Sequence, residues 1–171
     1  DEIVQWSRHS VAEIANLRPK WRVESRTRPG QSLYALSWEF ANDPRNTRFV
    51  IIESGVIDSW TAEPVVPRLL DMIDYVQQEG RKVIITGFAR QVEKTGKFKW
   101  LTAAQVGTHD AWNEGARYAA KQTGSEFADC GAAMFLPEVD IIDAVHPDMY
   151  YNLRLTWALI DAMDRAAPEC R

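Results

Sequence analysis

An aspartate and a histidine near the end of the chain have the spacing of a catalytic base pair. Asp143-Ala144-Val145-His146-Pro147 precedes a stretch of helical periodicity. On a turn, the carboxylate can bind one imidazole nitrogen and leave the other facing a cleft, which makes the imidazole a general base. Taken alone, the spacing also suits a helix cap beside an incidental histidine, and these residues by themselves favour that interpretation.

The elements that would position this pair alternate along the chain. Apolar periodicity predicts helices over residues 3–17, 62–78, 102–122 and 147–165, and strand-like runs over residues 21–25, 48–53, 82–86 and 126–130. Strands separated by helices predict an α/β fold with a mostly parallel sheet, in a single domain over residues 1–171. Binding sites of such sheets lie beyond the carboxyl ends of the strands.

The loops after the predicted strands therefore identify the candidate site. Gly30, the 55–60 segment, the 87–90 segment and the region of Gly131 should meet at one edge of the sheet. Trp60 and Phe88 could form an apolar or sugar-stacking wall there, or could equally pack beneath the crossover loops, as could Trp100 and Trp112.

The Asp-x-x-His-Pro block before a C-terminal helix resembles the last sequence block of the SGNH (GDSL-type) hydrolases. The likeness extends to Gly30 after the second predicted strand, to Gly55-Val56-Ile57-Asp58 after the next one, and to Asp1-Glu2-Ile3 at the start. It implies a flavodoxin-like three-layer α/β/α sandwich with a sheet of about five strands. It also implies an ester hydrolase.

The resemblance assigns roles to individual residues. It makes His146 the base, Asp143 the residue that orients it, and the Gly30 amide an oxyanion donor, with Asp58, Trp60 and Phe88 contacting substrate. The substrate would be an acyl or acetyl ester of a carbohydrate, or another small ester, and no cofactor is implied.

Two positions depart from the family pattern. Glu2 stands where the nucleophilic serine is expected, and Ile57 stands where an oxyanion asparagine is expected. Loss of one oxyanion donor alone typically lowers the rate by about two to three orders of magnitude. The alternative function is therefore a catalytically silent domain that binds a carbohydrate or a protein partner through the same cleft. A Glu2–His146 pair would raise the pKa of His146.

The other serines and histidines of this region are weaker candidates. Ser7 and Ser10 are better explained as ordinary serines of the first helix, and His9 as a surface residue. His109 could contact substrate, although a partly exposed helix histidine is the more frequent interpretation.

The family's first strand would precede residue 1 and lie inside the sheet. A sheet that lacks an interior strand leaves two rows of unpaired backbone groups, which is costly. We therefore expect an upstream segment of the parent chain to fill this position.

Composition argues against several classes of function. The net charge is −4 and the basic residues are scattered, so nucleic acid is not an expected partner. No apolar run approaches the roughly 18 to 20 residues of a membrane span, and no Cys/His cluster has the spacing of a metal site. Cys130 and Cys170 could form one disulfide or remain two thiols. The compartment stays open, with a secreted or periplasmic location favoured over a cytoplasmic one.

Overall fold

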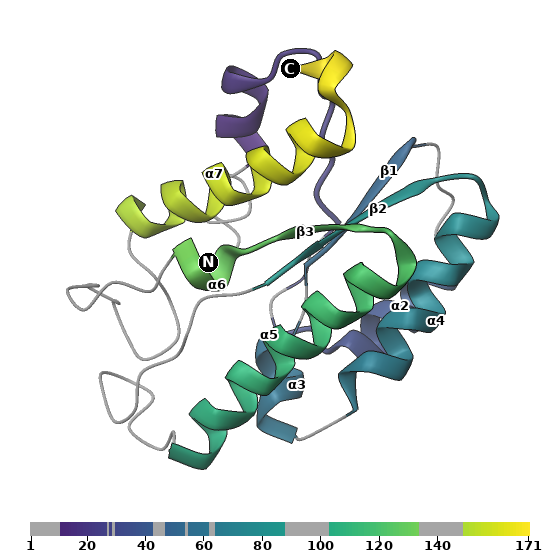
Figure 1. Ribbon diagram of the computed structural model, residues 1–171, viewed down its shortest axis with the longest axis vertical. Helices are drawn as coiled ribbons and strands as arrows, with labels where there is room; N and C mark the ends of the chain where they lie inside the picture. The colour runs from purple at the N-terminus through teal and green to yellow at the C-terminus, as the bar shows by residue number, and fades with distance from the viewer. Residues whose placement is uncertain are drawn as a thin grey trace.

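The computed structural model of the protein describes most of the chain. The described residues are 11–26, 28, 30–42, 47–53, 55–61, 64–87, 103–133 and 149–171. Figure 1 shows a central sheet with helices packed on both of its faces.

The sheet consists of three parallel strands in the described residues. They are β1 (Phe49–Ile52), β2 (Lys82–Thr86) and β3 (Glu126–Ala128), in the order β1-β2-β3. In the register, Ile51 lies opposite Ile84, and Ile85 lies opposite Phe127. The predicted parallel sheet is thus confirmed over three strands, all of which end at the same edge.

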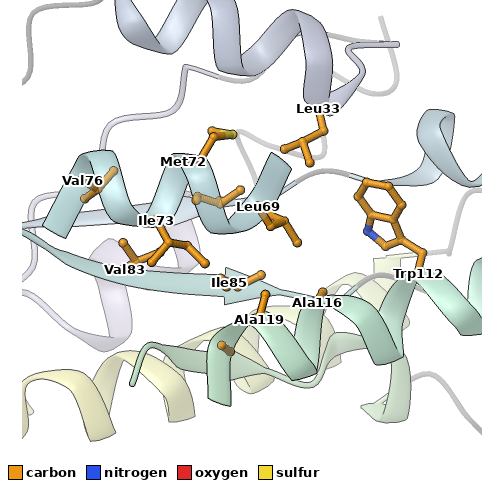
Figure 2. Packing of buried hydrophobic residues seen from close by; sticks show 12 residues of the cluster. Leu33, Leu69, Met72, Ile73, Val76, Val83, Ile85, Trp112, Ala116 and Ala119 are labelled. Carbon is orange, nitrogen blue, oxygen red and sulfur yellow. The ribbon is translucent and has the colours of Figure 1, made fainter. Parts of the chain in front are cut away.

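Four helices lie on one side of the sheet: α2 (Leu33–Ala41), α3 (Val56–Thr61), α4 (Val65–Gln78) and α5 (Ala103–Thr123). Their core side chains meet those of the sheet in one buried cluster, and Figure 2 shows how α4 and α5 come together over β2. Its fully buried members include Leu69, Ile73 and Val76 of α4 and Ala119 of α5. The small alanines of α5 allow this helix to pack closely against β2 and β3.

The opposite face of the sheet is covered by α6 (Cys130–Ala133), by α7 (Met149–Ala166) and by helical residues 11–17. A 3₁₀ turn, η2 (Pro168–Cys170), follows α7. Ile84 of β2 faces this second cluster, whereas Val83 and Ile85 face the first. The strand is buried on both faces, as its β-branched run predicts.

Most elements confirm the periodicity, but three details differ. The predicted strand at 21–25 is wrong, because residues 21–26 have no regular secondary structure. Trp21 and Val23 do alternate with exposed Arg22 and Glu24, and the Trp21 ring packs 4.8 Å from that of Phe49. The segment thus packs beside β1, but among the described strands β1 pairs with β2 alone.

The second difference is that three helices were not predicted: α2, and the short α3 and α6, which occupy the expected strand-end loops and the last residue of the predicted 126–130 strand. The third is the buried face of α7. The apolar period of the predicted 147–165 helix places Leu153, Trp157 and Ile160 on one buried side, yet Leu153 and Trp157 are 41% and 42% exposed, and of the three only Ile160 is buried. Because α7 turns Ala162 and Met163 toward the sheet, the Leu153–Trp157 side faces outward.

The expected upstream strand lies outside the described residues. Among these residues, β1 is paired with β2 alone, and residues 21–25 do not pair with it. The upstream segment stays a prediction.

A bidentate ion pair joins the 11–18 segment to α7. Arg18 donates from Nε and Nη2 to the two carboxylate oxygens of Asp164, at 2.7 and 2.6 Å, and both side chains are largely buried. The hydrogen bonds from Arg18 hold the pKa of Asp164 below its usual value. A folded pKa that is lowered stabilises the fold above the unfolded pKa of about 3.9. This contribution is lost as the pH falls through the lower, folded value.

We expect Arg18→Ala to lower the free energy of unfolding at pH 7 by more than the loss of an exposed ion pair would, because it leaves the Asp164 carboxylate without its main partner. Urea denaturation measures the effect, which should shrink as the pH falls below about 4. Arg26→Ala is the matched control, since Arg26 and Glu24 form an ion pair that is 62% exposed on both sides. Equal stability of the Arg18 and Arg26 variants would contradict this role.

Candidate functional site

The candidate site begins where a buried carboxylate fixes the start of α2. Asp58 of α3 is 2% exposed, and both of its oxygens accept the Leu33 backbone N–H at 2.9 Å. Ser32 caps the same helix, its Oγ accepting the Ala35 N–H at 3.2 Å. The turn that ends at Ser32 is thereby held against α3.

Gly30 lies in this turn, three residues before Leu33. Its φ of 70° belongs to the left-handed region, which favours glycine. Gly30 is exposed, and a Cβ there would meet no atom within 4 Å, so the backbone dihedral rather than crowding requires glycine. The predicted oxyanion donor is an exposed backbone amide in a turn whose position Asp58 helps to fix.

Asp58 itself was predicted to contact substrate. In the structure it binds the protein's own backbone, and that contact explains why a carboxylate stands at this position. Any contact of Asp58 with a substrate remains a prediction.

Ile57 and Trp60 lie beside Asp58 on α3. The helix begins after Gly55, which has a φ of 130° and whose carbonyl accepts the Ser59 N–H at 2.9 Å. Ile57 and Trp60 are half-buried. The Ile57 side chain has no hydrogen-bond donor, so this position cannot replace the amide expected from the family pattern.

A polar side chain that the sequence did not identify, that of Asn113 on α5, lies at the carboxyl end of β2. A Cβ on Gly87 would lie 2.9 Å from Asn113 Oδ1 and 3.1 Å from the ring of Phe127. Asn113 of α5 therefore lies directly against the backbone at the carboxyl end of β2. Its only signal in the sequence is a glycine straight after a buried strand, which marks a close approach of two segments.

Glu53 adds a carboxyl group at the end of β1. Desolvation of this carboxyl raises its pKa. Its charge also acts on Cys130, just after β3. Burial first, and then the charges of Glu53 and Asp129, raise the pKa of the Cys130 thiol.

Cys130 is therefore a thiol at neutral pH and not a nucleophile. Its Sγ lies 3.7 Å from the Leu155 carbonyl, which accepts the weak S–H hydrogen bond. Cys130 and Cys170 are both free, so the alternative of two thiols applies and the disulfide does not.

Trp112 is 4% exposed and packs in the core, which supports the packing interpretation for this tryptophan.

Several predicted residues fall outside the described part of the chain. They are Glu2, Ser7, His9, Ser10, Phe88, Trp100, Asp143 and His146. His109 lies on α5, but its side chain is not among those described. Convergence of Gly30 with Asp143 and His146 thus stays a prediction.

Solved structures share this arrangement of helices and strands. The acetyl xylan esterase Axe2 from Geobacillus stearothermophilus superposes with a TM-score of 0.68 at 18% identity, over 92% of this chain and 80% of that one. A catalytic mutant of the same esterase reaches 0.71. The fold is the one that this esterase has.

A second enzyme extends the comparison. An alpha/beta hydrolase enzyme from the metagenome of Lake Arreo, Spain, has a TM-score of 0.66 at 15% identity, with 92% and 80% of the two chains covered. No protein-family model and no curated protein matches the sequence. The likeness therefore resides in the fold.

The described residues contain neither a cluster of metal ligands nor a helix suited to a membrane. Within these ranges, no three His, Cys, Asp or Glu side chains gather closely enough to hold a metal ion. None of the helices described there combines the length and apolar character that a membrane span requires.

Proposed function

We propose that the protein is an SGNH-type ester hydrolase that acts on an acyl or acetyl ester of a carbohydrate, or on another small ester. The observation that carries the proposal is a fold shared with an acetyl xylan esterase over 92% of the chain. Catalytic mutants of that esterase alter a serine, an aspartate and a histidine, the last two three positions apart. Asp143 and His146 have this spacing.

The proposed reaction is acyl transfer through a serine. The hydroxyl attacks the ester carbonyl, and its proton passes to His146, which Asp143 orients. The Gly30 N–H stabilises the oxyanion of the tetrahedral intermediate. His146 then returns the proton to the departing alcohol, and water releases the acid from the acyl-serine by the same steps.

The described geometry supports the role of Gly30. An oxyanion donor is effective when it is fixed before the charge develops. The two hydrogen bonds from Leu33 to Asp58, together with the Ser32 cap, hold the segment directly after Gly30. Glu2 stands at the family's usual serine position, so we propose that the nucleophile is another serine.

The second candidate is a silent domain that binds a carbohydrate or a protein partner. Ile57 favours it, because the half-buried hydrocarbon at the oxyanion position donates no hydrogen bond. Glu2 favours it as well. Both candidates use the same edge of the sheet and differ in whether a serine there is reactive.

A fluorophosphonate probe separates the two candidates. We expect the hydrolase to acquire one covalent adduct, visible by intact mass spectrometry, and peptide mapping to place it on a serine. A reactive serine needs its base, so the adduct should form far more slowly in His146→Ala. Heat-denatured protein is the control for non-specific labelling. A folded protein without any adduct would instead support the silent domain.

A further inference from the structure

Two aromatic side chains stand out from α2. Tyr34 is 62% exposed and Trp38 is 69% exposed. They are four residues apart on one helix, so they lie on the same side, about 6 Å apart along its axis. Large aromatic rings left this open are costly to hydrate and are frequent in binding sites.

A shallow pocket lies between α2 and α4, and Ser37, the chain neighbour of Trp38, is one of its lining residues. Its volume is about 160 Å³, and it is lined by Ser37, Phe40, Ala41, Arg68, Asp71, Met72 and Tyr75. The Arg68 guanidinium lies 4.6 Å from the centre of the Tyr34 ring and connects the pocket to α2. Phe40 supports Tyr75 edge-on, with ring centres 6.3 Å apart.

This surface is continuous with the candidate site. Tyr34 directly follows Leu33, whose N–H binds Asp58, and Gly30 lies just upstream. Arg68 lies in the first turn of α4, and Tyr75 lies two turns further along. The aromatic and charged groups therefore extend from the turn that holds Gly30 along the flank formed by α2 and α4.

We propose that Tyr34, Trp38, Arg68, Asp71 and Tyr75 form a binding track for the sugar chain that carries the ester. The inference rests on the proposed function, whose substrate it specifies as an oligosaccharide rather than a small ester. The ring faces would pack against the C–H faces of sugar units. Arg68 and Asp71 supply a hydrogen-bond donor and an acceptor for hydroxyl groups.

The chemistry of the track favours a sugar over a protein partner. A protein-binding face usually has a contiguous apolar centre with a polar rim. Here Ser37, Arg68 and Asp71 lie among the rings and inside the pocket itself. Interleaved aromatic and hydrogen-bonding groups suit a ligand that is itself amphipathic along its length.

The test is binding of xylohexaose, which carries no ester, measured by titration calorimetry. We expect Trp38→Ala to raise the Kd about fivefold or more, because truncation of an exposed aromatic contact removes a main part of such an interface. Tyr118→Ala is the matched control: Tyr118 is 52% exposed, but on α5, and its variant should bind like the unaltered protein. The ratio of acetyl-xylooligosaccharide to p-nitrophenyl acetate turnover should fall in Trp38→Ala only.

The outcomes separate this inference from the proposed function. Trp38-dependent binding by a protein that hydrolyses no ester would uphold the track and overturn the hydrolase. The track is wrong if xylohexaose does not bind, or if Trp38→Ala binds it as tightly as the unaltered protein. It is also wrong if gel filtration shows a dimer that Trp38→Ala converts to a monomer, since the rings would then belong to a self-association interface.

Discussion

The His146→Ala variant is expected to hydrolyse p-nitrophenyl acetate with a kcat/KM about 10²- to 10⁴-fold lower than that of the unaltered protein. General acid–base catalysis by a positioned imidazole contributes a factor of this size. The proposed mechanism uses His146 twice, first to take the serine proton and then to protonate the leaving alcohol. The loss should appear mainly in kcat, because alanine removes a group that acts in the transition state.

His9→Ala is the control for this experiment. The sequence predicts that His9 is a surface residue, so its removal should leave kcat/KM within about twofold of the unaltered value. Hydrolysis that is unchanged in His146→Ala would reject the proposed base. Thermal unfolding of both variants shows whether a loss of activity reflects a loss of fold.

Asp58→Ala is expected to lower the free energy of unfolding by about 2 to 3 kcal/mol. The substitution leaves the buried Leu33 N–H without its acceptor and removes a carboxylate from the start of α2. Urea denaturation measures the loss. Because the same contact holds the turn after Gly30, kcat for ester hydrolysis should also fall in the fraction that remains folded.

Two variants refine this second prediction. Asp58→Asn keeps one carbonyl oxygen that can accept the Leu33 N–H, so its loss of stability should be smaller. Asp74→Ala is the surface control, because Asp74 accepts an exposed hydrogen bond from Gln78, and the effect of this variant should stay within about 0.5 kcal/mol. If Asp58→Ala were as stable as Asp74→Ala, the account of how Gly30 is positioned would be wrong.

The core elements follow from periodicity because local pattern and burial agree. Val83-Ile84-Ile85 can be buried on both faces only within a covered parallel strand, and β2 has the predicted bounds. The periodicity that predicts the helices at 62–78 and 102–122 also agrees with burial, because apolar residues of α4 and alanines of α5 lie in the core. Elements of this kind can be predicted from the sequence without knowledge of their neighbours in the fold.

Other elements depend on their neighbours. Residues 21–25 alternate like a strand, yet among the described residues they form no ladder with β1, although Trp21 packs on Phe49 of that strand. Leu153 and Trp157 fit a buried helical stripe as well as Ile160 does, and only the packing of α7 on the sheet selects its inner face. When two faces of a helix fit the apolar pattern equally well, the sequence alone does not show which of them is buried.

In the candidate site as well, some features follow from the local sequence and others arise only from the packing of distant segments. Gly30 was identified as a glycine after the predicted 21–25 strand; that strand is wrong, but Gly30 does have the positive φ of a turn. The contact between Asp58 and Leu33 joins residues that are 25 positions apart, so no local pattern reveals it. The approach of Asn113 to Gly87 also arises only when the elements pack together.

Acetate release from acetylated xylo-oligosaccharides tests the central claim most directly. The unaltered protein should release many acetate molecules per protein molecule, followed by proton NMR, and pretreatment with the fluorophosphonate probe should stop the release. A folded protein that releases acetate no faster than buffer, from these substrates and from p-nitrophenyl acetate, would contradict the assignment as an ester hydrolase.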